Sequence, residues 1–207
     1  MPFSTPPWYV FSSPGLSDAP NPRSIPACCA LLIHGQILSP AHLLTAVFLA
    51  LHALSTHRPK TRSPHAELVF RLSPNNNIAQ SYALFGITDT TTALVVVKLA
   101  CRATTRPTAT GTHVGIQVDE RVTAQGVGEH LARVVQGDSV LLGERGEGLG
   151  DGCDVARVRA VYKLGGVAAK KGGQKVAAGM SERQGRQVNE GKELESVVLG
   201  MLSLKGS

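Results

Sequence analysis

Apolar residues recur every three or four positions after Ser39, which is the spacing of one face of an α-helix. The positions concerned are Leu43, Leu44, Val47, Leu51 and Leu54. Ser39 is a typical N-cap, and Pro40 suits the first helical position because its missing N–H is not needed there. We therefore predict a helix that begins here and ends before Pro59.

Short runs of apolar, β-branched and aromatic residues predict the strands. Residues 8–11 and 67–72 are such runs, and residues 29–33 form a further apolar segment. Residues 93–99 contain a continuous apolar stretch at positions 94–97, which is typical of a strand covered on both faces. This last strand is therefore expected near the centre of the sheet.

Further segments have the spacing or the end signals of helices. Residues 75–77 are three asparagines whose side chains can cap a short helix, and Gly86 would end it. Residues 127–135 predict another helix, ended by Gly137, and residues 155–164 contain another segment of periodic apolar residues.

The last part of the sequence predicts an amphipathic helix over residues 193–204. Its apolar positions follow the spacing i, i+3, i+4, i+7, i+8, and they are Leu194, Val197, Val198, Met201 and Leu202.

The remaining segments are rich in Pro, Ser, Thr or Gly and predict loops. They are residues 12–26, 102–112, 144–152 and 165–191. We expect a single domain with a core over residues 29–164 and the C-terminal helix, with 12–26 and 165–191 as linker or disordered segments. The fold class is α/β (α+β): a small mixed or largely antiparallel sheet flanked by helices, with flexible Gly-rich insertions.

Composition agrees with one packed domain, since 43% of the 207 residues are hydrophobic. The longest apolar stretch, residues 43–54, is shorter than the roughly 20 apolar residues of a membrane span, so we expect no membrane partner. The four cysteines include no CxxC pair, which disfavours a zinc site, and they are expected as small buried hydrophobes. No metal or cofactor is expected.

Positive charge is concentrated in one part of the chain, whose net charge is +6. Residues 155–192 hold nine Lys or Arg and two Glu, whereas residues 67–154 hold seven basic and ten acidic side chains. The sequence therefore has no broad positive face of the kind that alone indicates a nucleic-acid-binding protein. The basic segment is interpreted either as a solvated loop or as a phosphate-binding strip.

No catalytic motif is found. The glycines of residues 143–152 do not open a helix as a dinucleotide fingerprint requires, and Glu193 follows Gly191-Lys192 where a phosphate loop has Ser or Thr. Neither HExxH nor GxSxG occurs. We assign no catalytic residue.

The most distinctive stretch carries a resemblance to a known family. The motifs are KTR at residues 60–62, LSPNNNI at 72–78, FGI at 85–87 and LVVVKL at 94–99, and weaker similarity continues to the KG of residues 205–206. They resemble the PRPK-binding protein family (TPRKB-like). Its members are small regulatory subunits of the EKC/KEOPS complex, which makes threonylcarbamoyl-adenosine in tRNA.

This resemblance implies a non-catalytic protein that binds the PRPK-type kinase/ATPase and modulates the complex, meeting other subunits indirectly, in nucleus and cytoplasm. We predict that the apolar face of the C-terminal helix is the kinase interface, to which the resemblance also points. Archaeal relatives are associated with holding the 3′ CCA end of tRNA. By resemblance, tRNA contacts then fall to Lys60, Arg62, Arg71, Asn75 and Asn76.

Alternatives remain open at this point. Lys60 and Arg62 are equally well explained as a solvated turn, and the asparagines as helix caps. Another class of function is an enzyme in which residues 165–191 close over a phosphorylated substrate. A third is a generic RNA-binding module, although Tyr82 and the other aromatic residues are not interleaved with the basic ones in the sequence.

Overall fold

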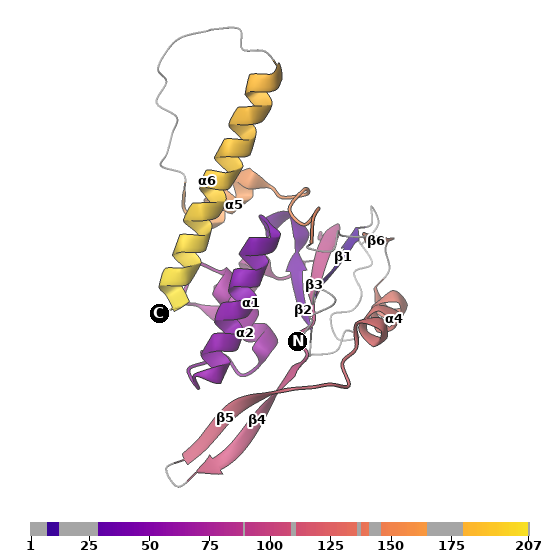
Figure 1. Ribbon diagram of the computed structural model, residues 1–207, viewed down its shortest axis with the longest axis vertical. Coiled ribbons are helices and arrows are strands. Elements are labelled where there is room, and N and C mark those ends of the chain that lie inside the picture. Colours follow the sequence, from indigo (N-terminus) through magenta and orange to yellow (C-terminus); the bar gives the residue numbers. More distant parts are fainter. Residues whose placement is uncertain are drawn as a thin grey trace.

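The computed structural model describes most of the chain, namely residues 8–12, 29–88, 90–108, 111–135, 138–140, 146–164 and 180–206. A small antiparallel sheet has helices on both faces, and a two-stranded hairpin extends from one end of the domain (Figure 1). The predicted fold class, a largely antiparallel sheet flanked by helices, is confirmed.

The main sheet has the strand order β2-β3-β1-β6 with antiparallel pairing throughout. Its strands are β1 (Trp8–Ser12), β2 (Ala30–Ile33), β3 (Ala93–Val97) and β6 (Asp138–Val140). Along β3, Val95 and Val97 join one apolar cluster, while Leu94 and Val96 join a second one on the other face. The prediction of a central strand covered on both sides is therefore confirmed.

Side-chain caps set the start of three helices at or close to their predicted positions. Helix α1 (Pro40–Ser55) begins where the Ser39 hydroxyl accepts a hydrogen bond from His42 N, and helix α3 (Ile78–Phe85) begins at Asn77. Helix α4 (Ala124–Val134) is capped by Thr123 and so begins three residues earlier than predicted. A short 3₁₀ turn, η1 (His34–Gln36), joins β2 to α1, and α5 (Val155–Val161) follows the Gly-rich segment.

The predicted strand over residues 67–72 is wrong, because this segment belongs to helix α2 (Pro64–Leu72). Ser63 caps the helix by accepting from Ala66 N, and Pro64 occupies the first turn, the same Ser-Pro signal that starts α1. Leu68 and Leu72, four residues apart, are both fully buried. Burial of this helical face outweighs the strand preference of Val69 and Phe70.

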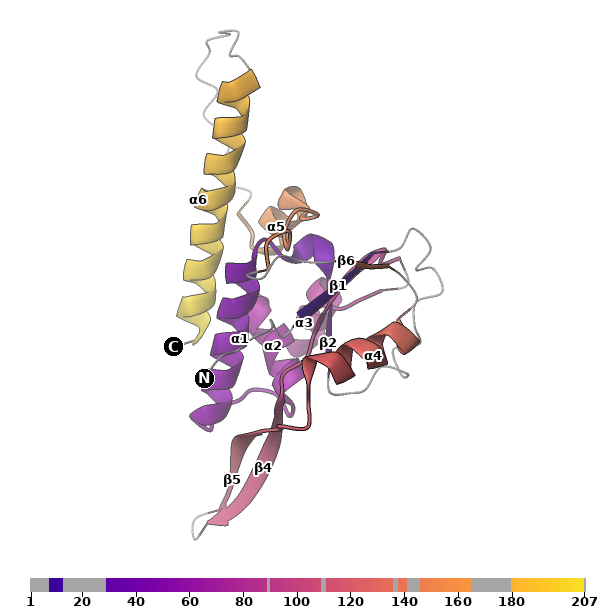
Figure 2. The same cartoon turned by 45° about the vertical axis from the view of Figure 1, so that its right-hand side comes forward.

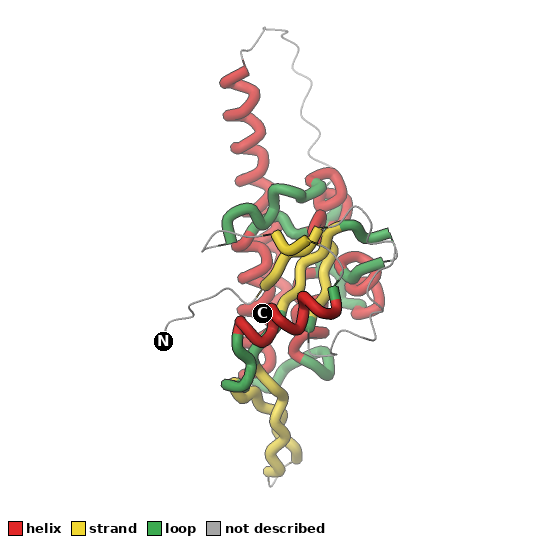
Figure 3. Tube along the Cα trace, turned by 90° about the vertical axis from the view of Figure 1, so that its right-hand side faces the viewer, coloured by secondary structure: helices red, strands yellow, loops and turns green. Residues whose placement is uncertain are grey.

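The predicted loop over residues 102–112 is also wrong, because it lies in a hairpin of β4 (Cys101–Thr108) and β5 (Gly111–Val118). Threonine is β-branched and favours strands, and Pro107 is tolerated because a two-stranded ribbon leaves one side of each strand unpaired. Figure 3 shows this hairpin beyond the end of the main sheet.

The Gly-rich segment before α5 forms consecutive turns, as expected of a loop. Gly146, Gly148 and Gly150 have φ of 82°, 92° and 117°, values that favour glycine. A Cβ on Gly150 would lie 2.4 Å from the Leu38 carbonyl oxygen. The repeated glycines therefore serve backbone geometry.

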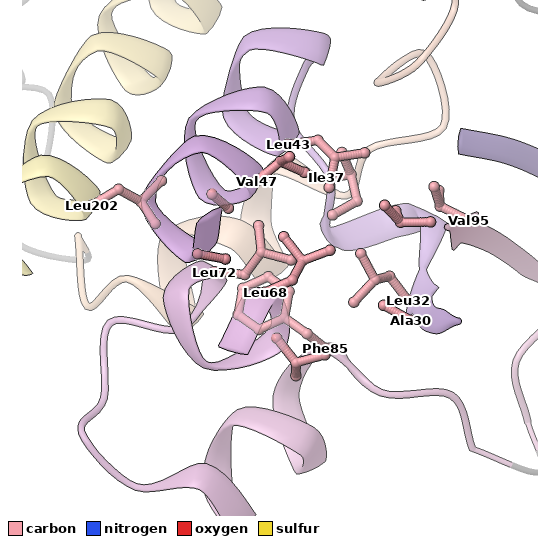
Figure 4. Packing of buried hydrophobic residues seen from close by; sticks show 14 of the residues in the cluster. Ala30, Leu32, Ile37, Leu43, Val47, Leu68, Leu72, Phe85, Val95 and Leu202 are labelled. Atoms are coloured by element: carbon pink, nitrogen blue, oxygen red, sulfur yellow. The ribbon is translucent and has the colours of Figure 1, made fainter. Parts of the chain in front are cut away.

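The main core lies between the sheet and the helices α1, α2, α5 and α6 (Figure 4). Helix α4 covers the opposite face of the sheet, where Leu131 and Val135 meet Leu94 and Val96 (Figure 2). None of the helices that the structure describes is long and apolar enough to cross a bilayer.

Helix α6 (Met180–Gly206) begins thirteen residues before the predicted start at 193. Residues 180–191 are therefore helical, whereas residues 12–26 and 165–179, also predicted as linkers, lie outside the described residues apart from Ser12 at the end of β1. The helix packs along α1, where the Ser39 hydroxyl donates to a carboxylate oxygen of Glu195.

The apolar face of α6 is largely used by the fold itself. Leu194, Val198 and Leu202 are buried in the main core, so these three side chains are not available as a free kinase-binding face. Met201 is half-buried against the same core, and Val197 remains 47% exposed. Of the residues predicted as the kinase interface, Val197 and Met201 therefore retain surface area, and binding of the kinase by this face stays a prediction.

A buried polar chain ties α1 to α5 and α2. Leu38 N–H donates to His42 Nδ1 at 3.2 Å, so the ring proton sits on Nε2. Nε2–H then donates to the Tyr162 hydroxyl at 2.7 Å, and this hydroxyl donates to the Leu72 carbonyl at 2.6 Å. When the imidazole is neutral, both of its nitrogens and the Tyr162 hydroxyl have hydrogen-bond partners. Burial lowers the pKa of His42 to about 4.

A second buried histidine adds to the same pH dependence. Leu99 N–H donates to His65 Nε2 at 3.1 Å, which again requires an unprotonated nitrogen. Burial, with a contribution from Lys98, lowers the pKa of His65 to about 4.

Acidification should destabilise the domain because of these two groups. In the unfolded chain both histidines take up protons near pH 6.5, whereas in the folded chain they do so only near pH 4, so the free energy of unfolding should fall between pH 6.5 and pH 4. His42 alone should account for ~3 kcal/mol. Urea denaturation at several pH values measures this, and His42→Gln should reduce the proton uptake on unfolding by about one. A variant with the wild-type pH dependence would contradict this interpretation.

Candidate functional site

Two neighbouring segments of the sequence and the distant end of α6 meet around a surface hollow of about 540 Å³. One side is the loop before α2, another is the turn from α2 into α3, and the third is the last turn of α6. The lining residues are Lys60, Phe70, Arg71, Asn76, Ile78 and Lys205.

The carboxylate of Glu67, which is fully buried, organises the loop that carries Lys60. Its Oε2 accepts from Lys60 N at 2.9 Å, from Thr61 N at 3.0 Å and from Thr61 Oγ1 at 2.9 Å. The backbone of the KTR motif is thus held against α2, while the Lys60 side chain is exposed.

Arg71 lies one helical turn after Glu67 and forms a buried ion pair with it. Arg71 Nε donates to Glu67 Oε1 at 2.9 Å, and the two side chains are only 7% and 0% exposed. Arg71 Nη1 also donates to the Lys205 carbonyl at 3.3 Å. The guanidinium therefore joins the loop, α2 and the end of α6 at the base of the hollow.

Lys205 reaches back from α6 over the end of α2. Its ammonium donates to the carbonyls of Phe70 at 2.5 Å, Ser73 at 2.6 Å and Asn75 at 2.6 Å, and it lies 3.8 Å from the centre of the Phe70 ring. Burial and the nearby Arg71 charge lower the pKa of Lys205 to about 8. The ammonium remains the main form at pH 7.

The structure brings together three of the five residues predicted to contact tRNA. Lys60, Arg71 and Asn76 line the hollow. Asn75 takes part through its backbone carbonyl, which binds Lys205. Arg62 is exposed and is not among the lining residues. Asn77 caps α3, so the capping alternative holds for this asparagine.

Two residues that organise the hollow, Glu67 and Lys205, were not predicted from the sequence. The Glu67–Arg71 spacing of four residues is a helical ion-pair signal, but it was hidden by the prediction of a strand over this segment. Lys205 belongs to the KG tail of the family resemblance, but no local pattern indicates a contact 135 positions away with Phe70.

Other chemistry is not evident at the site. Within the described ranges, no three His, Cys, Asp or Glu side chains come together as a metal site requires. Cys29, Cys101 and Cys153 form no disulfide, and burial raises the pKa of Cys101 and, to about 11, that of Cys153. Reactive thiolates are therefore disfavoured at Cys101 and Cys153.

Fold and hollow together define a small α/β binding protein, in which buried charges hold backbone segments around a cationic surface. A family model described as kinase binding protein CGI-121 matches residues 24–206, and the chain belongs to this family. The resemblance found in the sequence is thereby confirmed.

Relatives include EKC/KEOPS complex subunit CGI121 of Phaeosphaeria nodorum, 49% identical over 172 residues, which cover 82% of this chain and 70% of the relative. The corresponding subunit of Aspergillus terreus is 33% identical over 178 residues, 86% of this chain and 77% of the relative. That of Aspergillus fumigatus is 31% identical over 178 residues, 86% and 75% of the two chains.

Replacing Glu67 by glutamine should destabilise the protein because Arg71 would stay buried without its counter-charge. Breaking a buried ion pair from one side costs about 3–5 kcal/mol, so we expect a loss of this size in the free energy of unfolding of Glu67→Gln. Urea denaturation measures it. The matched control is Glu129→Gln on the exposed surface of α4, which should change stability by less than about 0.5 kcal/mol. Equal stability of Glu67→Gln and wild type would contradict the assigned role.

Proposed function

We propose that the chain is a non-catalytic subunit of the EKC/KEOPS complex. It binds the PRPK-type kinase/ATPase subunit, modulates formation of threonylcarbamoyl-adenosine in tRNA, and contacts the 3′ end of the tRNA through the hollow at Lys60. Family membership and the names of the relatives support the first part. The observation that carries the RNA contact is the meeting of Lys60, Arg71 and Asn76 in one hollow.

The hollow offers both kinds of contact that single-stranded RNA requires. Lys60, an exposed cation of the hollow, supplies positive charge for a phosphate, and Asn76 adds an amide that can hydrogen-bond a base or a sugar. Ile78 gives an apolar wall, and Tyr82, one helical turn further along α3, is 46% exposed. An unpaired base can stack on an exposed aromatic ring of this kind.

Removing the two exposed cations of the KTR motif should weaken RNA binding. The probe is a labelled RNA hairpin with a single-stranded 3′ CCA, followed by fluorescence anisotropy. Contact with about two phosphates predicts a slope of log K against log salt near −1.4. Lys60→Ala combined with Arg62→Ala should remove most of this slope and lower the affinity by about tenfold.

A matched control separates this site from the basic segment of the chain. Lys170→Ala combined with Lys171→Ala removes the same charge from residues that the structure does not describe. It should leave both affinity and slope nearly unchanged. If this control loses binding and the KTR double variant keeps it, the RNA contact lies outside the hollow.

Exposed apolar residues on α1 and α6 are the proposed kinase-binding surface. Leu44 and Phe48 are 45% and 65% exposed on α1, and Val197 is exposed on α6, which packs alongside α1. Large exposed apolar side chains on neighbouring helices are typical of a protein interface. Met201, also on α6, is half-buried and completes this surface.

A charge on this surface should weaken binding of the kinase. Val197→Glu should weaken the complex with a PRPK homologue by about tenfold or more, measured by co-expression and size-exclusion chromatography, because the carboxylate would be desolvated without a partner. Ala132→Glu, at an exposed position of α4 across the sheet, is the matched control and should bind normally.

The same substitution at the neighbouring Val198 should affect stability instead of binding. Val198 is fully buried, so Val198→Glu should lower the free energy of unfolding by ~3 kcal/mol or more, whereas Val197→Glu should keep near wild-type stability. Kinase binding by a folded Val197→Glu variant at wild-type affinity would place the interface elsewhere.

A further inference from the structure

The ammonium of Lys205 is fully engaged within the protein. An ammonium group has three N–H donors, and Lys205 Nζ has three carbonyl acceptors within hydrogen-bond distance, on Phe70, Ser73 and Asn75. Its carbonyl in turn accepts from Arg71. Although Lys205 lines the hollow, it has no donor left for a phosphate.

The carbonyls that Lys205 binds belong to the segment that shapes two walls of the hollow. Phe70 is in the last turn of α2, and Ser73 and Asn75 lead directly into Asn76 and Asn77. Ser73 Oγ accepts from Asn75 N, and Asn77 Oδ1 accepts from Ala79 N and Gln80 N at the start of α3. One ammonium therefore fixes the backbone from the end of α2 to the start of α3.

Tyr162 donates to the Leu72 carbonyl at the end of α2, but beyond Leu72 the long-range hydrogen bonds that the described residues make to 73–77 all come from Lys205. Asn76 and Ile78 are exposed, and the turn between α2 and α3 has bends and no strand pairing. Without the ammonium, three carbonyls would turn to water and the segment would gain conformational freedom. A ligand would then have to order it on binding, which lowers affinity.

We propose that Lys205 is a positioning residue of the hollow: by holding the carbonyls of Phe70, Ser73 and Asn75 it sets Asn76 and Ile78 for the RNA without contacting the RNA itself. The proposal rests on the proposed RNA-binding function and goes beyond it, because it assigns the end of α6 a role in a site built by α2 and α3. Contacting and positioning cations make different predictions for salt dependence.

The test compares Lys205→Met with Lys60→Ala, using the CCA-ended RNA hairpin and fluorescence anisotropy at several salt concentrations. Methionine keeps an unbranched side chain only one atom shorter than that of lysine and removes its three donors. Lys205→Met should lower the affinity by about tenfold while leaving the slope of log K against log salt close to that of wild type. Lys60→Ala should reduce the slope. The matched control is Lys192→Met, the same change at an exposed position of α6, which should alter neither quantity.

Amide hydrogen exchange gives a second readout that does not depend on RNA. In Lys205→Met the amides of Asn75, Ala79 and Gln80 should exchange at least about tenfold faster, while that of Val158 in α5 should keep its wild-type rate. This pattern supports local positioning. Faster exchange at all four amides would mean general destabilisation and would overturn the proposal.

The remaining outcomes are also decisive. A slope that falls in Lys205→Met as much as in Lys60→Ala would show that Lys205 contacts the RNA, which overturns the proposal. Unchanged exchange at Asn75, Ala79 and Gln80 would overturn it as well. If the wild-type protein does not bind the RNA, the proposed function and the RNA role of Lys205 both fail, whereas faster local exchange would still support its hold on the segment.

Discussion

The buried carboxylate of Glu67 is the interaction on which the surface hollow depends. A charged group without solvent is tolerated only when its lone pairs are satisfied, and Glu67 accepts from two backbone amides, one hydroxyl and one guanidinium. Each of these donors is itself part of the site or leads to it. The hydrogen bonds that make burial of the carboxylate tolerable are thus the same ones that hold the Lys60 backbone and the Arg71 side chain in place.

Arg71 extends this arrangement to a part of the chain that arrives much later in the sequence. Its guanidinium donates to the Lys205 carbonyl, and the Lys205 ammonium donates to the carbonyls of Phe70 and Ser73 around the end of α2. The end of α2 and the end of α6 are therefore joined by hydrogen bonds from both cations. Like charges lie close together here, and the buried Glu67 carboxylate offsets part of their repulsion. The result is a positively charged hollow that the fold can support.

Local signals in the sequence were enough for elements with strong ends or unambiguous burial. The Ser39-Pro40 pair and the asparagine cap at Asn77 correctly predicted the starts of α1 and α3, because capping depends on residues within one turn. The strand predicted over residues 67–72 is a helix, because the Ser63-Pro64 start and the burial of the helical face outweigh its β-branched and aromatic content. Tertiary burial decided between the two readings.

The residues of the hollow also differ in whether a short stretch of sequence is enough to predict them. Lys60, Arg71 and Asn76 could be found because the family resemblance covers a short continuous stretch. Burial of Leu194, Val198 and Leu202 in the protein's own core could not be predicted in this way. An amphipathic pattern shows that one face of a helix will be buried, but it does not show which surface covers that face. The contact between Lys205 and Phe70 lacks any local signal for the same reason.

The long sequence separation within these contacts also constrains the order of folding. Ser39 and Glu195 lie 156 positions apart, and Lys205 and Phe70 lie 135 apart, so docking of α6 must close very large loops. Contacts of this kind form late, after the local helices and hairpins. Until α6 docks, helices α1 and α2 lack the contacts that they make with α6, and the turn before α3 lacks the Lys205 ammonium. An intermediate with correct secondary structure but an undocked α6 therefore has no finished hollow, because Lys205 lines the hollow and belongs to α6.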